Sequence, residues 1–154
     1  MKPSLKLTNA IHILIYIARA DKQSSYSSKD IANSVNTNPS RIRALMSDLQ
    51  NADIIKREGD HFSRPILAKP ATEITMADVL KAVDPSSVTF PLDNKVNEEC
   101  PIAQQVNPVL AGYYELFDES LIQKMKTVTF EDILKDVNER AGEPLCQVNG
   151  IENA

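Results

Sequence analysis

The feature that most constrains the fold is a pair of short amphipathic segments separated by a turn of two residues. The first segment starts at Ser27, a residue that caps helices, with Asp30 three positions later in the place of a capping box. Its inward side chains are Ile31, Ala32 and Val35. This pattern predicts a short helix that ends before the turn at Asn36-Thr37.

The second segment starts at Asn38-Pro39. Asn is a strong N-cap, and Pro suits the first helical position because its missing N–H would have no partner there. The apolar residues that follow recur at helical spacing and are Ile42, Leu45, Met46 and Leu49. The pattern ends at residues 51–53, so we expect a second short helix close behind the first.

Helical and strand patterns flank this pair. Residues 5–20 have a broad apolar face with helical periodicity, and residues 54–57 and 66–68 are typical of two short strands of a hairpin. Pro65 lacks an N–H and suits only an edge position of that hairpin. Thr75 is placed to cap a further helix with its apolar side at residues 79, 80 and 83.

The remainder of the chain predicts a linker and a long helical region. Residues 84–97 contain two prolines and no periodicity. The helical region after them is expected to be interrupted or to restart at Asn107-Pro108. A last helix is predicted to start at Thr129 and to end at Gly142. An apolar stripe along the long region contains Val106, Val109, Leu110, Tyr113, Phe117, Leu121 and Met125.

Two short helices, a tight turn and a hairpin, in this order, outline a winged helix-turn-helix. The fold class we predict is mainly α with a small β-hairpin wing, followed by a long C-terminal helix. If the apolar residues of the segment after Asn38 face inward, its opposite face is small and polar, with Arg41 and Arg43 beside it. Arginine can pair with guanine in the major groove or bind phosphate.

The predicted DNA contacts lie on this segment, before it and on the wing. They are Ser28, Thr37, Asn38, Ser40, Arg41, Arg43, Ala44 and Ser47, followed by Lys56, Arg57, His61 and Arg64. An alternative interpretation is a solvated helix face that happens to carry arginines, with ordinary exposed charges on the wing. The order of elements, the cap and the charge distribution favour DNA.

The charge is divided unevenly along the chain. The net charge is −4, yet the first 70 residues contain 11 Lys and Arg against 6 Asp and Glu, a balance of +5. The rest contain 6 against 15, a balance of −9. A basic first half joined to an acidic second half is an asymmetry typical of nucleic-acid proteins.

Composition argues against other classes of protein. There is no phosphate-binding glycine loop, no His/Cys spacing typical of a metal site and no plausible nucleophile–base pair, so we expect no enzyme. His12 is expected to pack or bond near the core and not to bind metal. No apolar run is long enough to cross a bilayer, no secretory signal is recognisable, and two cysteines suit a reducing compartment, so we expect a cytoplasmic protein.

The chain resembles the Rrf2 family of bacterial regulators, which includes the iron–sulphur-cluster regulator and the cysteine-metabolism repressor. The resemblance covers about residues 5–138. The matching segments are residues 10–14, 38–45, 66–70, 73–83, 100–102 and 128–133. It implies a homodimer joined by the long helix, with the apolar stripe as the interface, that reads a palindromic operator in double-stranded DNA with two recognition helices.

The chain also departs from the family. The family's wing is usually rich in glycine, whereas residues 60–65 are bulky and include Pro65. Asp53 stands where a glycine is typical, at a place where a left-handed conformation favours Gly.

The cysteines depart most. Cluster-binding members have three closely spaced cysteines after the fourth helix, but this chain has only Cys100 there, with Cys146 in the tail. An iron–sulphur cluster normally needs four thiolates or equivalents, so we expect no such cofactor. Cys100 precedes a helix start, where the dipole favours a thiolate. It is either a redox sensor or, the interpretation we favour, a small apolar residue at the dimer seam.

We therefore predict a sequence-specific, homodimeric DNA-binding regulator of the repressor type, whose small effector, if any, is unknown. The predicted domains are a winged helix-turn-helix at 1–83, a linker at 84–100, dimerisation helices at 101–141 and a tail at 142–154. The competing hypothesis is a winged-helix module for protein interaction, favoured by the glycine-poor wing and the acidic second half.

Overall fold

The computed structural model describes residues 4–20, 26–59 and 64–142. His61 of the predicted wing contacts and all but the first residue of the predicted tail lie outside the described residues. The elements in chain order are α1 (Lys6–Arg19), α2 (Ser28–Val35), α3 (Pro39–Asn51), β1 (Ile55–Arg57), β2 (Pro65–Leu67), the 3-10 turn η1 (Ala71–Glu73), α4 (Met76–Val83), α5 (Pro101–Met125) and α6 (Phe130–Ala141).

Short-range capping determines where the helices begin. The side chains of Ser27, Thr75 and Thr129 each accept a hydrogen bond from the backbone N–H three residues later, and an aspartate at that position bonds back to the capping residue's N–H. Each capping box satisfies two backbone N–H groups that the helix itself leaves without a partner. The helix starts predicted from the sequence at these three residues are confirmed.

The two strands form an antiparallel hairpin in which Ile55 pairs with Leu67 and Arg57 with Pro65. Pro65 is the first residue of β2 and sits at the end of the ladder, where its missing N–H costs least. Ile54, just before β1, accepts a further bond at 2.9 Å from the N–H of Ala68. The predicted mainly helical winged fold is thereby confirmed.

One core unites α1, α2, α3, α4 and the hairpin. Its fully buried side chains are Ile13, Leu14, Ile31, Ile42, Leu49, Ile54, Ile55, Ile74, Val79 and Phe130. Burial of each side chain of this size contributes about 1.5–3 kcal/mol, which favours one fixed arrangement of these four helices and the hairpin. The orientation of α3 is therefore determined by its buried face.

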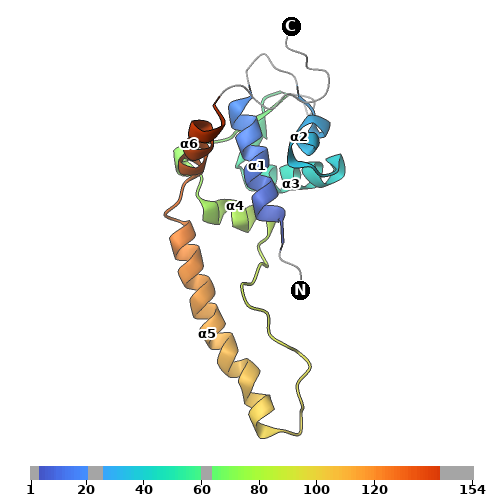
Figure 1. Cartoon of the computed structure of the whole chain (residues 1–154), viewed down its shortest axis with the longest axis vertical. Coiled ribbons are helices and arrows are strands. Elements are labelled where there is room, and N and C mark those ends of the chain that lie inside the picture. Colours follow the sequence, from blue (N-terminus) through green and yellow to red (C-terminus); the bar gives the residue numbers. More distant parts are fainter. Residues whose placement is uncertain (1–3, 21–25, 60–63, 143–154) are drawn as a thin grey trace.

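The last helix, α6, returns to this core (Figure 1). Phe130 at its first turn is completely buried, and its N–H donates to the carbonyl of Ile74 at 2.6 Å. The N–H of Met76 donates to the carbonyl of Val128 at 2.9 Å. The entries to α4 and α6 are thus held together, and α6 packs on the winged domain of its own chain.

The helix α5 is continuous, which corrects the prediction of a break at Asn107-Pro108. Pro108 lies inside α5 and lacks the N–H that would bond to the carbonyl of Gln104. No residue of α5 is buried, so water can reach a carbonyl left free in this way. Asn107 also anchors the preceding segment, because its Nδ2 donates to the carbonyl of Asp93 at 2.6 Å.

In Figure 1, α5 projects away from the group formed by the other helices, and residues 84–100 run out beside it and back to its start. The end of α5 that lies farthest from the other helices is therefore little stabilised by contacts with the winged domain. Among the described residues, no helix has the length and the apolar character that a membrane span requires.

Candidate nucleic-acid interface

The N-terminus of α3 is an exposed, rigidly held surface. Asn38 caps the helix, with its Oδ1 accepting from the N–H of Arg41 at 2.9 Å, and Pro39 occupies the first turn. Ile42, Leu45, Met46 and Leu49 are buried. The predicted contacts on the opposite face are exposed, namely Asn38, Ser40, Arg41, Arg43, Ala44 and Ser47.

Arg43 connects the two short helices. One guanidinium nitrogen, Nη1, donates to Oγ of Ser28 at 3.3 Å, and Nη2 donates to Oγ of Ser40 at 3.2 Å. Ser28 is the first residue of α2, so the arginine bridges the starts of α2 and α3. Two of its five N–H donors suffice for these bonds, which leaves donors for another acceptor. Thr37, in the turn between the helices, is half-buried.

The wing presents basic residues in different environments. Lys56 is exposed and forms an ion pair with Glu58 at 3.6 Å, whereas Arg57 and Arg64 are half-buried. The guanidinium carbon of Arg64 lies 5.8 Å from the ring centre of Tyr26, within the range of a cation–π interaction. The described part of the wing therefore holds one of its arginines in place through an aromatic ring.

Tyr26 is a positioning residue that the sequence analysis missed. Its hydroxyl donates to the carbonyl of Pro65 at 2.8 Å, and its ring meets that of Tyr16 edge-on at 5.4 Å. Burial raises the pKa of Tyr26 to about 12, although the charges of Arg64 and Arg57 act in the opposite direction. The available signal was its position just before the N-cap Ser27, where an apolar residue often packs back on the helix.

The stripe predicted on α5 is largely open. Val106, Val109, Tyr113, Phe117 and Leu121 are exposed, and Leu110 is half-buried. Met125 is also half-buried and packs against the core of the winged domain. Two further apolar residues that the analysis missed have large exposed fractions, Ile102 with 77% and Leu116 with 57%. Cys100, half-buried, is the N-cap residue of α5, and its side chain makes no capping bond.

The fold and this surface define a class of protein, the winged-helix DNA-binding regulators. The family model of Rrf2, described as an iron-dependent transcriptional regulator, matches residues 4–136. The chain belongs to the Rrf2 family. The resemblance noted in the sequence is thereby confirmed, and the protein is a DNA-binding transcriptional regulator and not an enzyme.

Individual proteins are similar over most of the chain. It is 29% identical over 129 residues to YwnA of Bacillus subtilis (strain 168), assigned as an HTH-type transcriptional regulator, with 84% of this chain and 94% of YwnA covered. A crystal structure assigned to a DNA-binding protein is 26% identical, with a TM-score of 0.66 and coverage of 84% and 98%. IscR of T. potens shares the fold at 19% identity, with a TM-score of 0.64 and coverage of 94% and 93%.

The iron dependence in the family's description has no match in the described residues. No group of three or more His, Cys, Asp or Glu side chains within them is placed to hold a metal ion. Cys100 is the one cysteine in this part of the chain. These residues therefore do not fit an iron or iron–sulphur site.

Proposed function

We propose that this regulator is a cytoplasmic homodimeric repressor that reads a palindromic operator by inserting α3 of each subunit into the major groove. The observation that supports it most is the exposed start of α3, where Ser40, Arg41 and Ala44 stand above a buried apolar face. Small side chains let the helix approach the bases closely, and arginine recognises guanine with two parallel hydrogen bonds. The N–H of Ser40 at the helix start favours an adjacent phosphate.

The unpartnered stripe on α5 supports the dimer. Regulators of this family bind DNA and act as dimers. Val109, Tyr113 and Phe117 are each at least half exposed, at 55%, 56% and 50%. A two-fold axis places the same patch of each subunit against its copy, so one apolar stripe is enough to make an interface. The repressor assignment follows from size, since a small dimer covering its operator leaves little surface for recruiting a polymerase.

Replacing Arg41 and Arg43 together with alanine tests the recognition assignment. The operator is first selected from a random duplex pool, and its Kd is measured by fluorescence anisotropy. Each arginine–guanine pair contributes about 1–3 kcal/mol, so we expect a loss of at least roughly 30-fold for the double variant. Arg140→Ala, an exposed residue of α6, is the matched control. An unchanged Kd with an unchanged melting temperature would contradict the assignment of α3 to the DNA interface.

A charge on the stripe tests the dimer. The variant Val109→Glu/Tyr113→Glu should sediment as a monomer in analytical ultracentrifugation, because two carboxylates of each subunit would meet their copies in an apolar seam. It should also lose cooperative binding to the full palindrome. Lys135→Glu, exposed on α6, adds negative charge elsewhere and should leave the dimer intact. A dimer that survives both substitutions on α5 would contradict this interface.

A further inference from the structure

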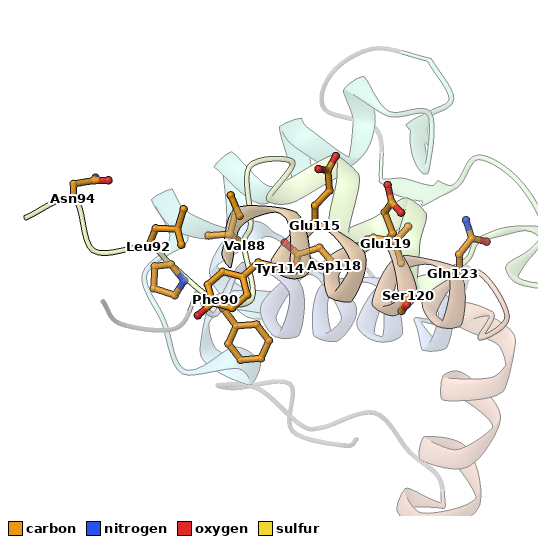
Figure 2. Close-up of a pocket in the computed structure, with 13 residues that line it drawn as sticks. Val88, Phe90, Leu92, Asn94, Tyr114, Glu115, Asp118, Glu119, Ser120 and Gln123 are labelled. Atoms are coloured by element: carbon orange, nitrogen blue, oxygen red, sulfur yellow. The ribbon is translucent and has the colours of Figure 1, made fainter. Parts of the chain in front are cut away.

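A wide cavity lies between α5 and the segment that runs beside it, on the projecting part of the molecule (Figures 1 and 2). Its volume is about 1180 Å³. Pockets that enclose drug-sized ligands measure about 300–1,000 Å³, so the space suffices for a small molecule. Residues 88–94 form one wall, and residues 111–123 of α5 form the other.

The wall from the segment is apolar and incompletely covered. Val88 and Phe90 retain exposed fractions of 52% and 48%, and Figure 2 shows them with Leu92 beside the helix. Phe90 is held in position by two rings of α5, those of Tyr114 at 5.4 Å and Phe117 at 6.2 Å. A ligand with an apolar body would cover this surface, and the removal of apolar surface from water would favour binding.

The wall from the helix is acidic. Glu115, Asp118 and Glu119 line the cavity, and no Lys, Arg or His does. Within the described part of the chain, no basic side chain forms an ion pair with these three carboxylates. Oδ1 of Asp118 accepts from the N–H of Thr89 at 3.2 Å, which holds the carboxylate at the mouth of the cavity. The uncompensated negative charge favours a cation and disfavours an anion.

We propose that this cavity binds a small amphipathic cation, with an apolar or aromatic body and a single positive charge. The apolar body packs on Val88, Phe90 and Leu92, and the charge lies between the carboxylates of Glu115 and Asp118. The faces of the rings of Phe90 and Tyr114 add cation–π attraction. Neither apolar surface nor negative charge alone would select this class of ligand, but the two together do.

The position of the cavity gives such a ligand a route to the DNA-binding surface. The wall formed by residues 88–94 belongs to the segment that follows α4, and α4 packs against α1, α3 and α5. If DNA also distinguishes between arrangements of these elements, a ligand that binds one of them more tightly changes operator affinity, and DNA changes ligand affinity by the same factor. This inference rests on the proposed function and adds an effector site to it.

The test uses two ions of the same shape and opposite charge, tetraphenylphosphonium and tetraphenylborate. Isothermal titration calorimetry on the full chain without DNA should show saturable binding of the phosphonium in the micromolar range and none of the borate. The variant Glu115→Gln/Asp118→Asn/Glu119→Gln should weaken phosphonium binding at least tenfold. Glu131→Gln/Asp136→Asn/Glu139→Gln removes three exposed carboxylates of α6 and serves as the matched control.

A second measurement tests the effector role. Saturating phosphonium should shift the Kd of the selected operator at least fivefold in the wild-type chain and not in the cavity variant. Equal binding of both ions, or no saturable binding up to millimolar phosphonium, would overturn the site. A cavity variant that no longer dimerises would show that a second copy of the chain covers the cavity, which would also overturn it. Because the calorimetry needs no DNA, its failure is distinct from a failure of operator recognition.

Discussion

At the scale of single residues, Asp53 shows how a local backbone conformation limits the choice of side chain. It follows α3 with φ of +57°, in the left-handed region, and its N–H donates to the carbonyl of Gln50 at 3.1 Å. A Cβ in this region costs about 1–2 kcal/mol, and glycine avoids that cost. The sequence analysis expected a left-handed residue here from the family's glycine, and this expectation is confirmed.

Replacing Asp53 with glycine should stabilise the protein. The relief of backbone strain exceeds the entropy that glycine loses on folding by about 0.5–1 kcal/mol. The free energy of unfolding, measured by urea titration followed by circular dichroism, should rise by that amount. Asp53→Ala keeps the Cβ and should show no gain. A similar gain for both variants would attribute the effect to the carboxylate and not to φ.

His12 is predicted to make stability depend on pH. It is half-buried, its Nε2 lies 3.0 Å from Oγ of Ser34, and burial lowers its pKa from the ordinary value of 6.5. The unfolded chain therefore binds a proton more readily than the folded one as pH falls below 6.5. The contribution of His12 to the free energy of unfolding is complete above that pH. It is lost as pH falls through the lowered pKa of the folded state.

The measurement is the free energy of unfolding from pH 8 to pH 5, with His12→Gln as the comparison. The wild-type chain should lose more stability than the variant over the acidic part of this range, because glutamine does not titrate there. Parallel pH profiles of the two proteins would contradict the assignment.

At the scale of elements, the start of α3 depends on one side chain. Asn38→Ala removes the acceptor of the N–H of Arg41, and loss of such a cap costs about 1 kcal/mol. We expect a lower midpoint of urea unfolding and, because the helix start carries the predicted contacts, weaker operator binding. Asn33→Ala, on the exposed side of α2, makes the same chemical change without a cap and should have little effect.

The attachment of α6 depends on Phe130. Truncation to alanine leaves a cavity in the core, and such changes cost about 3–5 kcal/mol. Phe130→Leu, a milder change, keeps the result interpretable if the alanine variant does not fold. Phe90→Ala removes the same ring from a half-exposed position and should cost far less. The measurement is the melting temperature in thermal unfolding. An equal decrease in melting temperature for Phe130→Ala and Phe90→Ala would mean that α6 is not part of the core.

At the scale of the whole molecule, the charge separation seen in the sequence is present in space in part, between the winged domain and α5. The basic residues of α3 and of the described wing belong to the winged domain, and the carboxylates Glu115, Asp118 and Glu119 lie on the projecting helix. Such an arrangement orients the basic end toward DNA and keeps the acidic end away from phosphates.

Salt dependence should therefore identify phosphate contacts. If Lys56 neutralises one phosphate, Lys56→Ala should reduce the slope of log K against log salt by about 0.9 while preserving sequence preference. Lys135→Ala, exposed on α6, should leave the slope unchanged. The assay is operator binding between 50 and 200 mM salt, a range over which a single contact changes log K by about half a unit. An unaltered slope for Lys56→Ala would place that residue away from the DNA.

Features that depend on neighbours within a few residues could be read from the amino-acid sequence. The caps at Ser27, Asn38, Thr75 and Thr129 could be predicted because each arises from bonds spanning about one turn of chain. The hairpin could be predicted because its two strand patterns lie close together in the sequence. The buried face of α3, and with it the exposed position of Arg41, followed from the 3.6-residue period.

Features that depend on residues far apart in the chain became visible only in the folded protein. The sequence could not show that Arg64 lies over Tyr26, that Phe130 joins the core, or that residues 88–94 leave a cavity against α5. Pro108 was interpreted as a break because local rules count its missing N–H, whereas the exposed helix tolerates that loss. Contacts between distant segments form only when the whole chain folds around one core, and no local sequence pattern predicts them.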